Sequence, residues 1–195
     1  MKLIKNTKRM ISIILSLAAV MPLSSCARKD PYKWEGHSYQ ELRSFYRERL
    51  DEFQNVADII AGNRDFWEKG REYPEAEGSA WISSPNDEKK MAFFSPDEQA
   101  VLADFFNATK PYMIELRYNE YVEISYINED KTGGYSFVYF SSYVNGDPEE
   151  LERKKDSIIR DRGNYRFDQE GNIIIDQEDY ADYEELSDLW LLVWD

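Results

Sequence analysis

The stretch YMIELRYNEYVEISYINEDKTGGYSFVYF, residues 112–140, decides the fold. Its first two runs alternate apolar and polar side chains, a period-two pattern typical of strands that bury one face. The apolar members of these runs are Ile114, Leu116, Tyr118, Val122, Ile124 and Tyr126. The turn sequence Lys131-Thr132-Gly133-Gly134 leads into a third run that continues the same apolar face. We therefore expect an antiparallel meander over 112–144.

The register of the first hairpin follows from its loop. A three-residue loop at 119–121 would pair Leu116 with Ile124. It would also place Arg117 opposite Glu123, which is a favourable cross-strand pair. A two-residue loop would set Leu116 against Glu123, so the sequence favours the three-residue loop.

Helices are expected on both sides of the meander in the sequence. Three segments begin with N-terminal capping signals, which are Ser38 with Glu41, Ser95 with Glu98 around Pro96, and Asp147 before Pro148. We expect the first helix to end at Gly62, the second before Pro111 and the third at Gly163. Residues 64–90 are charged and marked by Gly and Pro, so we expect a loop there with one short strand near Trp81.

The C-terminal part adds strands to the sheet. Two short runs, 165–167 and 173–175, flank a turn at 170–172, and 189–194 is apolar enough for a buried strand. The predicted fold is therefore α+β. It has an antiparallel sheet of about five to six strands with about three helices packed beside it, in a single globular domain over 38–195.

The first 25 residues have a different composition from the rest. Four basic residues and no acid precede an apolar run at 10–21, and small residues follow it. A run of about 12 residues is too short to span a bilayer, which needs about 20. This arrangement is typical of a secretory signal peptide that is removed.

The end of this segment, Leu23-Ser24-Ser25-Cys26, resembles the lipobox of bacterial lipoproteins. The resemblance covers residues 1–26. It implies that 1–25 is cleaved, that Cys26 carries a diacylglycerol, and that 26–37 is a short tether. An ordinary signal peptide with an incidental cysteine is the alternative. Cys26 is the single cysteine of the chain, and a lone thiol in an exported protein calls for an explanation, so acylation is favoured.

The charge balance excludes one large class of partners. The chain has 38 acidic and 24 basic residues, a net charge of −14. Removal of the leader takes four basic residues with it, so 20 would face 38 acids, a net charge of −18. Nucleic acid is therefore not an expected partner, because phosphate contacts need a basic face. We expect lipid rather than charge to hold the body extracytoplasmically at a bacterial membrane.

Residues for catalysis or metal binding are few. His37 is the single histidine and is expected at a surface or cap position. With Cys26 acylated, Ser-His-Asp and Cys-His chemistry lack a partner, and zinc lacks ligands, so we expect no cofactor and no metal. The oxygen-rich turns at 128–130 and 168–172 do not complete a calcium loop, and plain turn chemistry is favoured.

Carboxylates leave one catalytic option open. Glu115 and Glu123 fall on neighbouring strands, on the face opposite the core. Paired acids could hydrolyse a glycoside. The favoured interpretation is a solvated sheet face on which Arg117 pairs with Glu123.

That same face is the candidate binding surface. Its residues are Met113, Glu115, Arg117, Ser125, Ile127, Ser136, Val138 and Phe140. A solvated face should be more polar than this set. Either another layer covers it, which is favoured, with a helix or 64–90 as the cover, or it is an open surface suited to a peptide or a sugar.

Three functions remain as hypotheses. The first is a lipid-anchored binding or accessory protein of the cell envelope, with a protein, peptide or glycan ligand. The second is an envelope glycan hydrolase that uses carboxylates. The third is an acidic inhibitor-like protein that binds a basic protein, because 165–195 holds ten acids and one base.

Overall fold

The computed structural model describes residues 32–71, 78–129, 131, 133–143, 146–163, 165–167, 173–175 and 182–194, with backbone alone at 161–163, 165–167 and 173–175. These residues form a seven-stranded sheet, a separate two-stranded hairpin, six α-helices and one 3₁₀-helix. The α+β class is confirmed, with a larger sheet and more helices than expected. No helix in the described ranges combines the length and apolarity needed to cross a bilayer.

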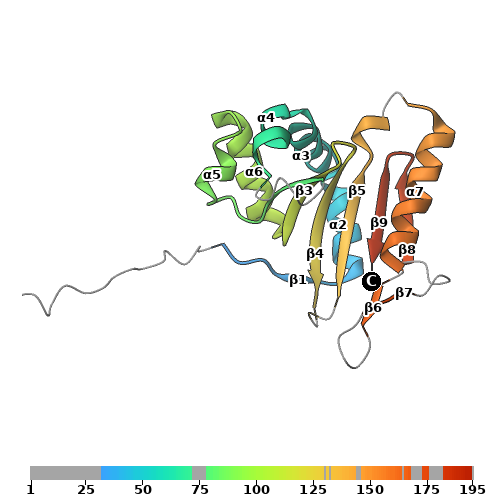
Figure 1. The fold of residues 1–195 in the computed structure, drawn as a ribbon. Coiled ribbons are helices and arrows are strands. Elements are labelled where there is room, and N and C mark those ends of the chain that lie inside the picture. The colour runs from blue at the N-terminus through green and yellow to red at the C-terminus, as the bar shows by residue number, and fades with distance from the viewer. Residues whose placement is uncertain are drawn as a thin grey trace, which may run out of the picture. The chain divides into compact units, whose positions relative to one another are not determined.

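The sheet places the meander at its centre (Figure 1). Its strand order is β2 (Ser79–Ile82), β3 (Met113–Arg117), β4 (Tyr121–Asn128), β5 (Gly134–Tyr139), β9 (Trp190–Trp194) and β8 (Asp182–Ser187), all antiparallel. The expected C-terminal strand is therefore confirmed as β9, inserted beside β5. The seventh strand, β1 (Gly36–His37), pairs in parallel with Ile127 and Asn128 of β4.

The register of the first hairpin differs from the prediction by two residues. Leu116 lies opposite Val122, and Glu115 rather than Arg117 lies opposite Glu123. The loop has three residues, as expected, but they are Tyr118, Asn119 and Glu120. Tyr118 and Asn119 both have a left-handed backbone, with φ of 54° and 55°, and the Tyr118 N–H donates to the Gly78 carbonyl at 2.6 Å. The left-handed backbone at Tyr118 ends β3 at Arg117, one residue earlier than predicted.

The helices begin where the capping signals indicate. They are α2 (Tyr39–Glu48), α3 (Leu50–Gly62), α4 (Arg64–Lys69), α5 (Glu88–Met91), α6 (Pro96–Thr109) and α7 (Pro148–Gly163), with the 3₁₀-helix η1 at Ser141–Tyr143. Both capping boxes, at Ser38 and Ser95, are formed. The predicted first helix breaks at Arg49, whose φ and ψ of −129° and 28° are not helical.

Residues 64–90 are more regular than expected. Asn63 caps α4 by accepting a hydrogen bond from the Phe66 N–H at 2.8 Å. Asp87 caps α5 in the same way. The short strand expected near Trp81 is confirmed as β2. The hairpin of β6 (Tyr165–Phe167) and β7 (Ile173–Ile175) is also confirmed, whereas β8 was not predicted.

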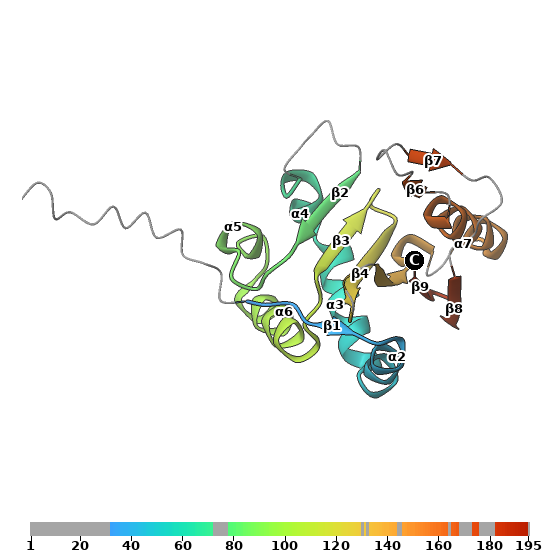
Figure 2. The same ribbon diagram turned by 90° about the horizontal axis from the view of Figure 1, so that it is seen from below.

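The main core lies between the first sheet face and helices α2, α3 and α6 (Figure 2). Its centre is aromatic. Phe53 of α3 packs its ring 4.8 Å from that of Phe137 on β5 and 5.0 Å from that of Phe105 on α6. All three are almost fully buried, and each contributes about 2–3 kcal/mol through removal of apolar surface from water.

The second sheet face is divided into two halves. Helix α7 covers the half over β5 and β9, where Val138 and Phe140 are fully buried with Leu191 and Val193 against Leu151, Ile158 and Ile159. The expected cover by a helix is therefore confirmed for this half. Val138 and Phe140 do not belong to an open binding surface, because the apolar side of α7 shields them from solvent.

The chain joins the domain at Tyr32, inside the segment assigned to the tether. Its hydroxyl donates to the Pro111 carbonyl at 2.5 Å, and its ring packs 5.3 Å from that of Phe106. The predicted leader and Cys26 lie outside the described residues.

Candidate functional site

The half of the second face over β3 and β4 carries a polar cluster. Its members are Glu115 and Arg117 on β3, Glu123 and Ser125 on β4, and Ser136 on β5. Period-two alternation places all five on one face. The observed register then sets Glu115 directly opposite Glu123 and Ser125 directly opposite Ser136. The strands alone therefore bring two carboxylates, one guanidinium and two hydroxyls together.

Arg117 holds the two carboxylates. Its Nε lies 2.8 Å from Oε2 of Glu115 and 3.3 Å from Oε2 of Glu123. The other oxygen of Glu123, Oε1, accepts hydrogen bonds from the hydroxyl of Ser125 at 3.1 Å and that of Ser136 at 2.8 Å. The two serine hydroxyls are also 3.2 Å apart. These bonds fix the orientation of every charged group in the cluster.

Burial makes this cluster different from the solvated face expected from the sequence. Glu115 and Glu123 are only 5% and 3% exposed, so that expectation is wrong, although Arg117 does pair with Glu123 as proposed. Burial by itself lowers the pKa of the Arg117 guanidinium. The charges of Glu123 and Glu115 outweigh burial and raise that pKa above its ordinary value. Arg117 therefore remains charged.

The cluster contributes little to the stability of the sheet. Like charges directly opposite each other on paired strands destabilise a sheet. Well-packed apolar side chains commonly match or exceed a buried ion pair in stability. Because the fold gains little from Glu115 and Glu123, we interpret the cluster as functional.

The outer edge of Arg117 is available to a ligand. Its side chain is 37% exposed, and Nη1 and Nη2 have no hydrogen-bond partner among the described residues. Two partly exposed aromatic residues are near it in the strand register or in the sequence. Trp81 of β2 lies opposite Glu115 and is partly exposed, and Tyr118, which follows Arg117, is 53% exposed. An exposed guanidinium with exposed aromatic residues nearby can recognise planar or polyhydroxylated groups.

The cluster also has a boundary on the side of α7. Lys154 of α7 places its ammonium 5.5 Å from the ring of Tyr118 and 5.7 Å from that of Tyr121. The same ammonium is 2.5 Å from Oε2 of Glu120. Tyr118 is thus held in place at one end, which reduces the entropy lost when a ligand packs on its ring.

The binding face expected from the sequence is recovered in part. Glu115, Arg117, Ser125 and Ser136 are brought together as expected, and Met113 and Ile127 lie partly exposed on the same face. The expectation left out Glu123 and Trp81. The alternation had placed Glu123 on this face as one of two possible catalytic acids, but not in the binding surface. Trp81 could not be placed because the pairing of β2 with β3 has no local signal.

The histidine lies directly before the N-cap Ser38 of α2, but it is buried and not at the surface. His37 is 6% exposed, and its ring lies 5.4 Å from those of Phe45 and Tyr126. Burial is the main cause that lowers its pKa, opposed mainly by the nearby charge of Glu41. Among the described residues no group of three or more His, Cys, Asp or Glu is placed to hold a metal ion. Asp130 and 168–172 lie outside those residues.

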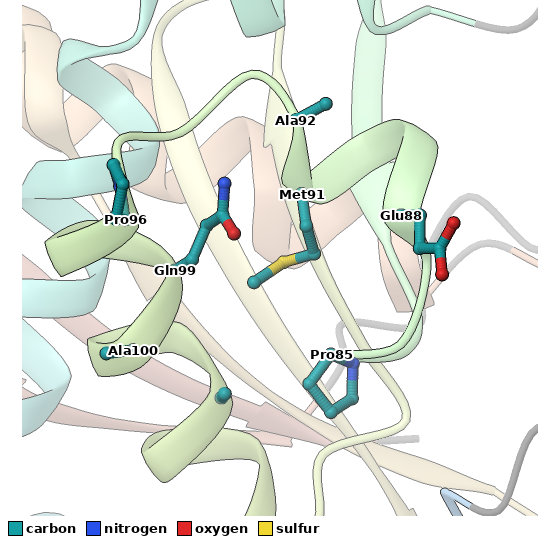
Figure 3. A pocket seen from close by; sticks show the side chains of 8 residues that line it. Pro85, Glu88, Met91, Ala92, Pro96, Gln99 and Ala100 are labelled. Atoms are coloured by element: carbon teal, nitrogen blue, oxygen red, sulfur yellow. The ribbon is translucent and has the colours of Figure 1, made fainter.

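An open groove between α5 and α6 is a separate feature of the surface (Figure 3). It encloses about 580 Å³ and is lined by Pro85, Glu88, Met91, Ala92, Pro96, Gln99, Ala100 and Ala103. Glu88 is its single charged lining residue, and the amide of Gln99 already donates to the Phe94 carbonyl at 2.8 Å. Since binding sites combine apolar walls with several converging polar groups, the polar cluster is the better candidate.

Comparisons with known proteins add no relative. No protein-family model, curated protein or solved structure matches the chain. The functional argument therefore depends on the geometry of the cluster and on the sequence.

Proposed function

We propose that this chain is a lipid-anchored, non-catalytic binding protein of the bacterial cell envelope, and that it binds a neutral glycan at the polar cluster. The observation that carries the proposal is the buried pair Glu115 and Glu123 clamping Arg117 through its Nε. This clamp leaves the outer edge of the guanidinium exposed and fixed in direction. A fixed donor fork is suited to acceptors that come in adjacent pairs.

The charge of the cluster selects among ligands. Two carboxylates and one guanidinium give the cluster a net charge of −1, in a chain whose net charge is −14. An anionic ligand would be attracted by the guanidinium but repelled by the net negative charge of the cluster and the chain. An anionic ligand is therefore disfavoured. Vicinal hydroxyls of a sugar carry no charge and can accept from Nη1 and Nη2. A pyranose ring can pack on Tyr118 or Trp81, whose rings are partly exposed.

Hydrolysis of the glycan fits the cluster less well. The two Oε2 atoms lie within about 6 Å of each other, close to the separation of about 5–5.5 Å between the acids of retaining glycosidases. Glycoside cleavage, however, needs one carboxylic acid that keeps a proton for the leaving group. Both carboxylates here direct an oxygen at the Arg117 Nε, at 2.8 and 3.3 Å, so they already act as acceptors for the guanidinium. The same geometry that favours binding therefore opposes general acid catalysis.

The ligand proposal is tested with the mature protein purified in detergent and a panel of immobilised neutral and charged oligosaccharides. We expect neutral glycans to bind and Arg117→Lys to lose at least tenfold in affinity, because lysine keeps the charge but not the fork. Arg49→Lys is the matched control, since Arg49 pairs with Glu52 on an exposed helix surface at 3.0 Å. Equal affinity of wild type and Arg117→Lys, or release of reducing ends from a bound glycan, would contradict the proposal.

The anchor rests on the lipobox-like sequence that ends at Cys26. It is tested by mass spectrometry of the native protein and by fractionation of cells that express Cys26→Ala. We expect an acylated N-terminal cysteine in the native protein and loss of the variant from the membrane fraction. An intact leader, or an unmodified thiol at Cys26, would remove the anchor from the proposal.

A further inference from the structure

We infer that the protein lies with one defined edge against the membrane, an edge formed by three aromatic residues and three lysines. The aromatic–lysine edge consists of Tyr32, Trp34 and Tyr112 with Lys33, Lys110 and Lys131. It contacts the headgroup region of anionic lipids. This inference rests on the lipid at Cys26 that the proposed function includes, and it goes further by giving the anchored domain an orientation.

The aromatic side chains of this edge are only partly buried. Tyr112 is 43% exposed, although it follows the buried Pro111. Its ring meets that of Trp34 edge-on at a centroid distance of 6.0 Å, and Trp34 is itself partly exposed. Tyrosine and tryptophan gather at the boundary between water and lipid because they combine an apolar ring with a polar tip.

Lysines accompany these rings. The Lys131 ammonium lies 5.4 Å from the ring centre of Trp34, and the Lys110 ammonium lies 5.6 Å from that of Tyr32. Lys33 is exposed between the two aromatic residues in the sequence. Lysine stems can lie along apolar surface while their charges reach the headgroups. Each lysine near an anionic surface strengthens binding about fivefold.

Among the described residues, the acids on the same edge are Glu35 and Glu129, both exposed; Asp130, next to Lys131 in the sequence, lies outside them. Within the described residues three lysines face two acids there, whereas the whole chain carries −14. Anionic lipid therefore repels the rest of the body more strongly than this edge. Electrostatics alone would turn the anchored domain so that the aromatic–lysine edge faces the bilayer.

The position of the anchor agrees with this orientation. Tyr32 is fixed to the Pro111 carbonyl, and it follows Cys26 by six residues. Six residues span at most about 20 Å when fully extended. Residues 32–34 come before β1, and Lys110 and Tyr112 follow α6; β1 and the end of α6 lie side by side (Figure 2). The lipid therefore enters the membrane within about 20 Å of the edge.

The test reconstitutes the lipidated protein into vesicles of phosphatidylcholine with 30% phosphatidylglycerol, in which part of the phosphatidylcholine is brominated near the headgroup. Bromine quenches tryptophan fluorescence on contact. We expect quenching of the wild type to exceed that of Trp34→Phe, with Trp34 supplying most of the quenched signal. Trp67→Phe is the control, because Trp67 lies on α4 against Arg71 and should not affect the quenched fraction.

Two further variants test the charge. We expect Lys33→Glu with Lys131→Glu to reduce quenching at least twofold, because the reversed edge is repelled by phosphatidylglycerol. Protein that sediments with the vesicles but shows equal quenching with and without Trp34 would overturn the orientation while leaving the anchor intact. Protein that does not sediment would refute the anchor and this inference together.

Discussion

Replacing Arg117 should destabilise the protein, because the two carboxylates of the polar cluster then lose the cation between them. In Arg117→Met, Glu115 and Glu123 would face each other across β3 and β4 without the cation that lies 2.8 and 3.3 Å from their Oε2 atoms. Two unit charges no more than about 6 Å apart repel by at least about 3 kcal/mol at an effective dielectric constant of about 20. Because the Arg117 side chain is 37% exposed, solvent screens part of this repulsion. We expect a loss of about 2–3 kcal/mol in the free energy of unfolding.

The assay is urea unfolding at pH 7, followed by tryptophan fluorescence and by circular dichroism. Arg117→Met combined with Glu115→Gln should recover about half of the loss or more, because one of the two facing charges is gone. Arg49→Met is the control and should cost less than about 1 kcal/mol, since its partner Glu52 is exposed. A loss below about 1 kcal/mol in Arg117→Met, or no recovery in the double variant, would refute the reasoning.

Three further predictions concern single positions. Ser95→Ala removes the cap of α6 and should cost about 1 kcal/mol in thermal unfolding, while Ser44→Ala on the exposed side of α2 should change stability little. Burial lowers the pKa of His37, so the folded protein is at full stability above about pH 6.5 and loses stability as the pH falls below that value. His37→Gln should flatten this slope between pH 7.5 and 5.5 in urea titrations, and an unchanged slope would contradict it. Asn119→Gly should stabilise by about 0.5 kcal/mol and Asn119→Val should destabilise, because φ is 55° there; effects of the same sign would disprove this account of the loop.

Much of the fold follows from local sequence signals. Capping boxes at Ser38 and Ser95 are formed by neighbours three residues apart, so the sequence contains everything needed to place them. The alternation in 112–140 likewise fixes which side chains share a face. Both signals were confirmed because each depends on contacts within one element or one hairpin.

The register of the first hairpin could not be obtained in this way. A shift by two residues leaves every side chain on the same face, so the hydrophobic pattern does not distinguish the two registers. The observed register depends on Tyr118, a residue type seldom found with positive φ, whose N–H donates to the carbonyl of Gly78, the residue before β2. Such a bond between distant residues has no local signature.

The residues of the candidate site were predicted in part, but their burial was not. Glu115, Arg117, Ser125 and Ser136 could be assigned to one face from the alternation alone. Their burial could not be predicted in this way. An acid at a polar position of an alternating strand predicts exposure to solvent unless its neighbours on other strands are known. The cover of Val138 by α7 is equally a property of packing between elements far apart in the sequence.

Strand β1 has a mechanical consequence. It is two residues long and continues the edge of β4 beyond the point where β3 ends. A pull on the chain ahead of Tyr32 would load its bond to Pro111 and then the two-residue pairing of β1, before any strand of the meander is strained. Release of 32–37 would lengthen the extended chain ahead of the domain by about 20 Å and leave the central sheet intact. Residues 32–37 can therefore detach under tension before the central sheet unfolds.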